Sequence, residues 1–297
     1  MIELHNYMGE IIALITAVVW AFAVILFKRS GESVHPIALN LFKGCLAFVL
    51  LIPTILIFSE LPSSSTPIVA YIALLVSGIL GVGIADTLFF VGLNNLGAGL
   101  SAIAGCVYSP AIILLSYIFL GESLTVVQFI GVIAILSAIF TANFERAKLP
   151  PGNWKRGIIS AISANIAIVL SVIIIKPYLD ILPLLWLTEI RIFGGILALF
   201  LFLIFSPRRR LILGSLKSAG SFKFTLSGAI IGTYLAMIFW IAGMKFTQAS
   251  TAAALNQTSN IFIFILAGVF LKERMTALRI LGIVLAVGGA ILVSLGK

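Results

Sequence analysis

Residues 98–131 read AGLSAIAGCVYSPAIILLSYIFLGESLTVVQFIG, and residues 249–282 read ASTAAALNQTSNIFIFILAGVFLKERMTALRILG. Each stretch is an apolar run followed by a short segment that carries a glutamate, and then by a second apolar run. Four residues recur 151 positions later, namely Ala102 as Ala253, Glu122 as Glu273, Thr125 as Thr276 and Gly131 as Gly282. Because charged residues are scarce in this chain, a glutamate that recurs in register indicates an internal duplication.

The duplication extends through the earlier part of each half. Lys28 and Lys43 recur 148 positions later as Lys176 and Arg191. Small residues match as well, namely Gly9 with Gly157, Ala13 with Ala161 and Gly92 with Gly243. The sequence therefore predicts two similar units, residues 9–143 and residues 154–295.

The composition excludes most classes of soluble protein. Apolar residues make up 61% of the 297 residues and charged residues only 10%, against roughly 25% charged residues in soluble domains. The net charge of +9 does not indicate a nucleic-acid partner, because the basic residues lie in short loops rather than on one continuous face. These features predict a multi-pass protein of the cell membrane, with the lipid bilayer as its partner.

The apolar runs predict an all-α protein with ten transmembrane helices, five in each unit. In the first unit they are 9–29, 36–58, 68–97, 98–120 and 124–143, and in the second 154–176, 183–205, 219–247, 249–271 and 276–295. The third and eighth segments are long, and each is predicted to be one tilted helix, because half of either would be too short to cross.

An odd number of helices in each unit means that the second unit crosses the bilayer in the opposite sense to the first. Inverted repeats of this kind are typical of transporters, whose sites lie near the midplane where the repeats meet. Lys and Arg concentrate in the loops after the odd-numbered helices, and only Lys176, Lys245 and Lys297 lie on the other side. By the positive-inside rule, both termini are predicted to be extracytoplasmic.

The run from Ser101 through Tyr108-Ser109-Pro110 to Gly121-Glu122, repeated in the segment that ends at Lys272-Glu273, resembles the EamA-type family of the drug/metabolite transporter superfamily. The second copy departs from the first at Ile261, which replaces Pro110, and at Lys272, which replaces Gly121. The resemblance implies a ten-helix carrier with a central cavity that moves small organic metabolites, often outward. A basic residue in the second helix, common in this family, is matched by Lys43 and Arg191.

Four charged residues fall inside predicted spans, namely Lys43, Asp86, Glu189 and Arg191. Each costs roughly 2.5–3.5 kcal/mol at a helix centre, so such residues indicate function or pairing. Lys43 and Asp86 lie at similar depths, and either a salt bridge that fixes helix registry or a substrate-carboxylate or proton-linked role is open. Arg191 is predicted to project into the cavity as the counterpart of Lys43, and Glu189 to lie near the outer headgroups.

Uncharged residues add further candidates for substrate binding. Aromatic side chains within spans are Trp20, Tyr108, Tyr234 and Trp240, and amides in the ninth helix are Asn256, Gln257 and Asn260. Each group is open to a second interpretation as helix packing. Glu122 and Glu273 are interpreted as structural anchors at helix N-termini, with Thr125 and Thr276 as nearby caps.

The sequence favours a secondary transporter over an enzyme. A nucleotide-binding P-loop, HExxH and GxSxG are absent, and the two histidines, His5 and His35, lie at the edges of spans. We therefore expect no catalytic residues, metal or cofactor, and a small-molecule substrate such as an amino acid or a related amphipathic compound. A phosphorylated-sugar or nucleotide-sugar antiporter is the alternative, with a membrane enzyme or a channel less favoured. The sequence leaves proton coupling and the choice of monomer or homodimer open.

Overall fold

The computed structural model describes residues 7–62, 66–105, 107–144, 153–217, 221–271, 281, 284–285, 288–289 and 291–293. Those residues form helices and connecting loops without any strand, which confirms the predicted all-α class. The helices of the first half are α2 (Met8–Ser30), α3 (Pro36–Phe58), α4 (Ile68–Gly78), η1 (Ile79–Ala85), α5 (Asp86–Gly105), α6 (Tyr108–Leu120) and α7 (Val126–Phe144).

The second half has the same order of elements, with short additions. Its helices are α8 (Trp154–Ile175), η2 (Lys176–Tyr178), α9 (Leu184–Phe205), α10 (Arg209–Gly214), η3 (Ser215–Lys217), α11 (Phe222–Gly228), η4 (Ala229–Leu235), α12 (Ala236–Phe246), α13 (Ala249–Asn256) and α14 (Ser259–Leu271). Six helices of the described chain are long and apolar enough to cross a membrane, and shorter apolar helices accompany them. The predicted tenth span, 276–295, lies mostly outside the described residues.

The two longest predicted helices are continuous, as expected, over Ile68–Gly97 and Phe222–Phe246. A π-helical segment of 7 residues, η1 or η4, lies in the middle of each. The N–H of Asp86 donates to the carbonyl of Gly81, five residues earlier, and the N–H of Ala236 donates likewise to Ile231. The wider turn was not predicted, because hydrophobic periodicity does not report it, and such segments are frequent at functional sites.

The prediction of single helices over 98–120 and 249–271 was wrong, because both are broken. The first helix of each broken pair ends at Gly105 or Asn256, and the next begins at Tyr108 or Ser259. In the second break the hydroxyl of Thr258 donates to the carbonyl of Leu255 at 2.7 Å. Such a side chain competes with the helical hydrogen bonds of the backbone.

Gly97 separates the third predicted span from the fourth. Its φ is 77° and its ψ 175°, outside the helical region. A residue with a side chain is strained at this φ, whereas glycine adopts it readily. The boundary predicted between residues 97 and 98 therefore coincides with a backbone feature that requires glycine.

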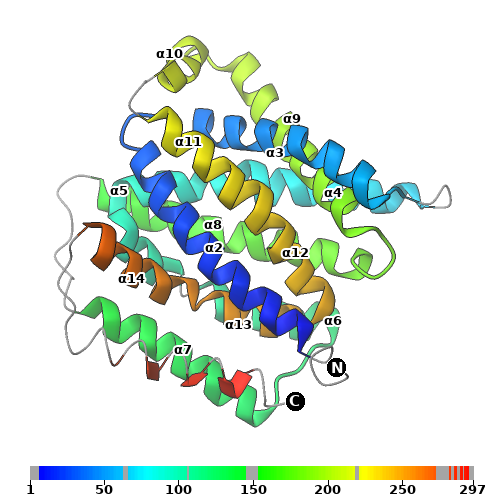
Figure 1. The fold of residues 1–297 in the computed structure, drawn as a ribbon, viewed down its shortest axis with the longest axis vertical. Helices are drawn as coiled ribbons and strands as arrows, with labels where there is room; N and C mark the ends of the chain where they lie inside the picture. The colour runs from blue at the N-terminus through cyan, green and yellow to red at the C-terminus, as the bar shows by residue number, and fades with distance from the viewer. Residues whose placement is uncertain are drawn as a thin grey trace.

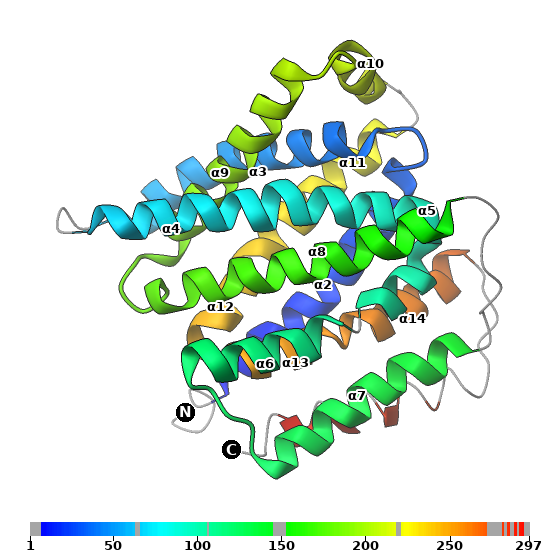
Figure 2. The ribbon, with the colours of Figure 1, turned by 180° about the vertical axis from the view of Figure 1, so that it is seen from behind.

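The first helix of each half packs mainly against helices of the other half (Figures 1 and 2). Helix α2 packs against α11, η4, α12, α13 and α14 of the second half, and α8 packs against α4, η1, α5 and α6 of the first. Helices α3 and α9 pack against one another. Equivalent helices therefore occupy equivalent positions, each against the other half.

Individual close contacts repeat in the same exchanged way. A Cβ placed on Gly92 would lie 3.1 Å from Cβ of Ala161, and one placed on Gly243 would lie 3.5 Å from Cα of Ala13. Gly92 matches Gly243 in the sequence and Ala13 matches Ala161, so each contact is the counterpart of the other. The glycines let the exchanged helices approach closely.

Replacing Gly78 should weaken the packing of α4 against α9. A Cβ on Gly78 would lie 2.0 Å from the carbonyl oxygen of Arg191, and because that atom belongs to the backbone, the helices would have to separate. We expect Gly78→Ala to cost about 1–3 kcal/mol and to lower the unfolding temperature of the purified protein. Gly214→Ala in α10 is the matched control, since a Cβ there meets nothing within 4 Å. Equal unfolding temperatures for the two variants would contradict the packing described.

Candidate functional site

A cavity of about 220 Å³ lies between the two halves of the bundle. Its walls come from α2, α3, η1, α5 and α6 of the first half and from α8, η4, α12, α13 and α14 of the second. Both helix breaks reach it, because Gly105, Tyr108, Asn256 and Ser259 are among the lining residues. The first helices of the two halves, α2 and α8, thus border the cavity together with later helices of both halves.

Most of the residues singled out in the sequence meet at this cavity. Those that line it are Trp20, Lys43, Asp86, Tyr108, Trp240, Asn256, Gln257 and Asn260. Arg191 and Tyr234 are not among the lining residues. The hydroxyl of Tyr234 instead pairs with that of Thr54 at 2.7 Å, which joins η4 to α3.

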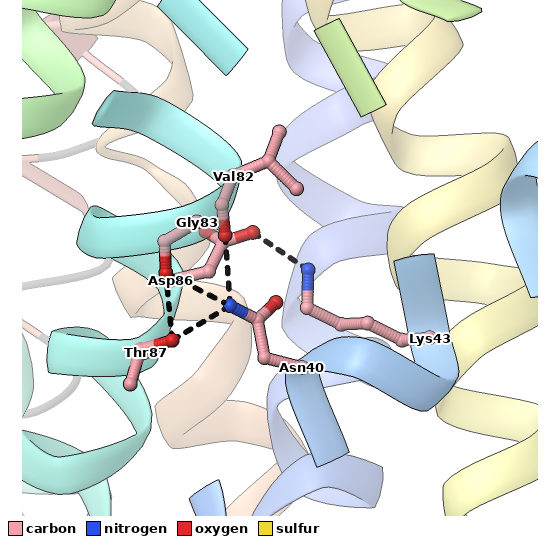
Figure 3. A network of polar contacts seen from close by, with 6 residues as sticks. All are labelled: Asn40, Lys43, Val82, Gly83, Asp86 and Thr87. Carbon is pink, nitrogen blue, oxygen red and sulfur yellow. Dashed lines mark hydrogen bonds and ion pairs between the residues drawn. The ribbon is translucent and has the colours of Figure 1, made fainter. Parts of the chain in front are cut away.

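An ion pair occupies one side of the cavity (Figure 3). The ammonium of Lys43, on α3, donates to Oδ2 of Asp86, at the start of α5, over 2.6 Å. Lys43 is only 3% exposed and Asp86 17%, and the ammonium also lies 5.7 Å from the ring centre of Phe90. The pair leaves the carboxylate as the more accessible partner.

Asn40 holds the π-helical turn next to this pair (Figure 3). Its amide nitrogen lies 2.8 Å from the carbonyl oxygen of Val82, 3.2 Å from that of Gly83 and 2.8 Å from the hydroxyl of Thr87. A π-helical turn frees carbonyls from the α-helical pattern, and buried carbonyls need a donor. Asn40 supplies one from the helix that also carries Lys43, so it fixes Asp86 relative to the ammonium.

Aromatic rings form a second part of the wall. Trp20 lies 5.8 Å from Phe89, and Phe89 lies 5.6 Å from Phe90, between ring centres. Trp240, from the second half, lines the cavity as the sequence counterpart of Phe89. The rings of Trp20, Phe89 and Trp240 give the cavity an apolar surface beside its charged pair, and Phe90 packs behind Phe89.

Amides line the part of the cavity near the breaks. Nε2 of Gln257 donates to the carbonyl of Gly105 at 3.3 Å, and Nδ2 of Asn260 donates to Oε1 of Gln257 at 2.9 Å. Gln257 therefore ties the two broken helices together. Asn256 also lines the cavity, and its side-chain oxygen and nitrogen are buried without a hydrogen-bond partner among the described residues.

The remaining two charges predicted within spans lie away from the cavity wall. Arg191 is 1% exposed, and its guanidinium donates to the hydroxyls of Ser77 and Ser171 at 3.0 and 2.9 Å. Glu189 is 4% exposed, so its side chain is buried within the bundle. Its depth near the outer headgroups stays a prediction. Their separation by two positions turns the two side chains to different faces of α9.

Sequence reasoning missed several lining residues, among them Thr16, Phe89, Ser101, Asn165 and Met237. Asn165 carried a signal, because a side-chain amide in the middle of an apolar helix has few uses other than binding or interhelical hydrogen bonding. Phe89 and Met237 carried none of their own. They are recognisable only as the counterparts of Trp240 and Asp86 in the duplication.

Glu122 anchors a helix of the other half. Its carboxylate accepts hydrogen bonds from the N–H groups of Ala249 and Ser250 at 2.9 and 3.1 Å, and from the Ser250 hydroxyl at 2.9 Å. It thereby caps the N-terminus of α13 rather than that of the helix after it, α7. That helix is capped by Thr125 and Gln128, which exchange hydrogen bonds reciprocally. Glu273 and Thr276 lie outside the described residues.

Comparisons with known proteins agree on the kind of molecule. The sequence model of the EamA-like transporter family matches the chain twice, over residues 7–144 and 155–295. A protein of Archaeoglobus fulgidus named an uncharacterized transporter is 22% identical over 273 residues, which cover 92% of this chain and 93% of that protein. The Bacillus subtilis protein named uncharacterized transporter YoaV is 26% identical over 143 residues, 48% of this chain and 49% of its own. A protein of known crystal structure has the same fold, with a TM-score of 0.76 and 17% identity over 96% of this chain and 95% of its own.

Breaking the ion pair from one side should destabilise the protein more than removing it altogether. Asp86→Asn leaves the buried ammonium of Lys43 without a counter-charge, which costs about 3–5 kcal/mol for a buried pair. The double variant Lys43→Met with Asp86→Asn removes both charges, and we expect it to unfold at a higher temperature than Asp86→Asn alone. A double variant that is the less stable of the two would show that the pair is not a charge-compensating unit.

Removing the cap that Glu122 provides should loosen α13. Glu122→Ala leaves two backbone N–H groups and one hydroxyl without their acceptor, and we expect a loss of about 1–2 kcal/mol. Thermal unfolding of the purified protein measures the loss, with Glu32→Ala in an exposed loop as the control. The cap would be unimportant if the two variants unfolded at the same temperature.

Proposed function

The chain belongs to the EamA-like transporter family, and we propose that it is a secondary carrier that moves small organic metabolites across the cell membrane by alternating access. The substrates we propose are amino acids or related amphipathic compounds, moved outward. The two halves would act as inverted repeats of five helices each, residues 9–143 and 154–295, which exchange conformations around a central site.

The exchanged packing supports the inverted arrangement. In a two-fold contact each element meets the counterpart of the element that meets it, and the paired contacts of Gly92 with Ala161 and of Gly243 with Ala13 have this property. A carrier built from two such halves reaches its opposite state when the halves exchange conformations, at little cost in energy. Family membership and the apolar helices make the chain a multi-pass membrane transporter.

The observation that carries the proposal is the cavity lined from both halves. Its volume of about 220 Å³ is below the roughly 300–1,000 Å³ of pockets that hold drug-sized ligands, so it fits a small metabolite. The lining combines aromatic and aliphatic walls with one ion pair and a group of amides. That combination matches a solute that is partly apolar and partly charged.

Lys43 and Asp86 together match a zwitterion. An α-carboxylate would accept from the Lys43 ammonium, and an α-ammonium would donate to Asp86, so the substrate would replace each residue's present partner. The rings of Trp20 and Trp240 and the amide of Asn256 would contact the remainder of the solute. Asp86 is also the residue that we propose for proton coupling, since a proton could take the place of the substrate's ammonium.

A carrier for phosphorylated sugars or nucleotide sugars is supported less well. Such a substrate bears two or more negative charges, and recognition of phosphates uses several Arg and Lys side chains. Among the described lining residues, Lys43 is the only cation, and it already has Asp86 as a partner. The small volume of the cavity also argues against a nucleotide sugar.

The orientation that we propose follows the charges of the loops. Lys28 and Arg29 lie in the last turn of α2, and Arg208–Arg210 lie at the start of the short helix α10 that follows α9. Both groups are at the ends of odd-numbered spans, which the positive-inside rule assigns to the cytoplasm. Both termini would then be extracytoplasmic. The same assignment makes the loop around Asp180 extracytoplasmic.

Counterflow of labelled amino acids in proteoliposomes tests the function. We expect saturable counterflow from the intact protein and a loss of at least about tenfold for Asp86→Asn, because the substrate's ammonium would have no carboxylate to bind. Asp180→Asn makes the same chemical change at an exposed position and should leave counterflow unchanged. Counterflow that is equal in the two variants would rule out a substrate-binding or coupling role for Asp86. Flux that does not saturate would indicate a channel.

A further inference from the structure

Arg191 is a buried cation that has no ion-pair partner among the residues that the structure describes. It is 1% exposed and lies on α9, in the second half of the bundle. Arginine stays protonated under almost all conditions in proteins, and an uncompensated charge in an apolar interior is strongly unfavourable. The surroundings of Arg191 must therefore supply polar groups or negative charge that compensate the guanidinium.

Hydroxyl groups accept hydrogen bonds from only some of the guanidinium nitrogens. Nε donates to Ser77 at 3.0 Å and one terminal nitrogen donates to Ser171 at 2.9 Å, while the two serines also bond to one another. The other terminal nitrogen, Nη1, has no partner among the described residues. Hydroxyls orient the group, but they carry no negative charge to balance it.

Trp240 lies between this cation and the cavity. The central carbon of the guanidinium lies 5.4 Å from the centre of the Trp240 ring, and Trp240 lines the cavity. A ring in this position shields the guanidinium from direct contact with a solute, but it does not cancel its field. The cavity therefore has a positive charge directly behind one of its aromatic walls.

The duplication shows where the missing charge would be. Lys43 and Asp86 pair in the first half, and their counterparts in the second half are Arg191 and Met237. The second half therefore has a cation, Arg191, at the position of Lys43, but a neutral methionine at the position of Asp86. Met237 lines the cavity, so the position that would balance Arg191 faces the site.

Neither Asp86 nor Glu189 neutralises the positive charge of Arg191. Asp86 attracts Arg191 electrostatically, but it already pairs with Lys43 at 2.6 Å. Both oxygens of Glu189 are buried without a hydrogen-bond donor among the described residues, and its position two residues before Arg191 turns it to a different face of α9. Two cations and one carboxylate therefore surround the site, with an excess of one positive charge.

We infer that the cavity selects small organic anions, specifically compounds that carry one carboxylate more than they carry ammonium groups. The inference rests on the proposed carrier function and narrows its substrate class to acidic amino acids and their analogues. Lys43 and Asp86 bind the zwitterionic part, and the additional carboxylate lies on the side of the cavity toward Arg191, whose charge it balances. Arg191 is a positioning residue, since it acts across the ring and does not touch the solute.

Uptake of acid and amide pairs of the same shape tests this selection. Glutamate is compared with glutamine, and aspartate with asparagine, in proteoliposomes that contain the full chain. We expect the acid of each pair to be taken up about tenfold faster or more at low concentration, because only the acid balances the excess charge. Arg191→Met should bring the ratio of acid to amide close to one, and Ser77→Ala, which leaves the charge in place, should preserve it.

Met237→Asp is a second test. It leaves Arg191 in place and introduces an acid at the position that Asp86 occupies in the first half. We expect it to reduce the acid-to-amide ratio by about tenfold, whereas Met237→Asn, of the same size but without charge, should keep the wild-type ratio. Only a change in the site's charge distinguishes these two variants, and the ratio for Arg191→Met shows whether the excess charge comes from Arg191.

Equal ratios for Met237→Asp and Met237→Asn would overturn the inference, as would wild-type protein that prefers the amides. Transport of zwitterionic amino acids alone, or of a sugar phosphate in place of the acids, would also overturn it while leaving a carrier function standing. An intact protein that shows no counterflow with any of these solutes would contradict the proposed function, and the inference would be lost with it.

Discussion

The ammonium of Lys43 and the carboxylate of Asp86 lie 2.6 Å apart in a bundle whose helices are otherwise largely apolar. In such an interior a charge needs a partner or a polar cavity, because its transfer from water is costly. The residues at the centre of the molecule supply both a partner and a cavity for this pair of charges. The π-helical turn before Asp86 frees carbonyls for Asn40, Asn40 fixes the turn next to Lys43, and the cavity opens beside the pair.

The two halves share a plan but differ in polarity at the site. The packing repeats between them, as the contacts of Gly92 and Gly243 illustrate, whereas the ion pair does not, since Arg191 and Met237 stand where Lys43 and Asp86 stand in the first half. In a carrier, equivalent packing would allow each half to adopt the conformation of the other. In the carrier that we propose, the equivalent packing would allow the motion, and the unequal charges would select the solute.

Much of this organisation could be predicted from the sequence, because scarce residues are informative. The recurrence of Glu122 and Lys43 in register predicted the duplication, and the apolar runs predicted α2, α3, α8 and α9 to within one residue at each end. The helix breaks and the π-helical turns could not be predicted in this way, because hydrophobic periodicity reports neither of them. The bond of Gln257 with Gly105, which joins the two breaks, links segments far apart in the sequence. The burial of Arg191 behind Trp240 likewise follows from the approach of α9 to α12, which no local pattern records.

The central claim is that one five-helix plan is used twice, in opposite senses across the bilayer. Single cysteines at Glu32 and Asp180, both exposed in loops that follow the first helix of each half, test it in a variant in which Cys45 and Cys106 are replaced by serine. In sealed vesicles of one orientation, a membrane-impermeant maleimide should label one position from outside and the other only after the membrane is permeabilised. Labelling of both positions from the same side would contradict the inverted arrangement and the alternating mechanism built on it.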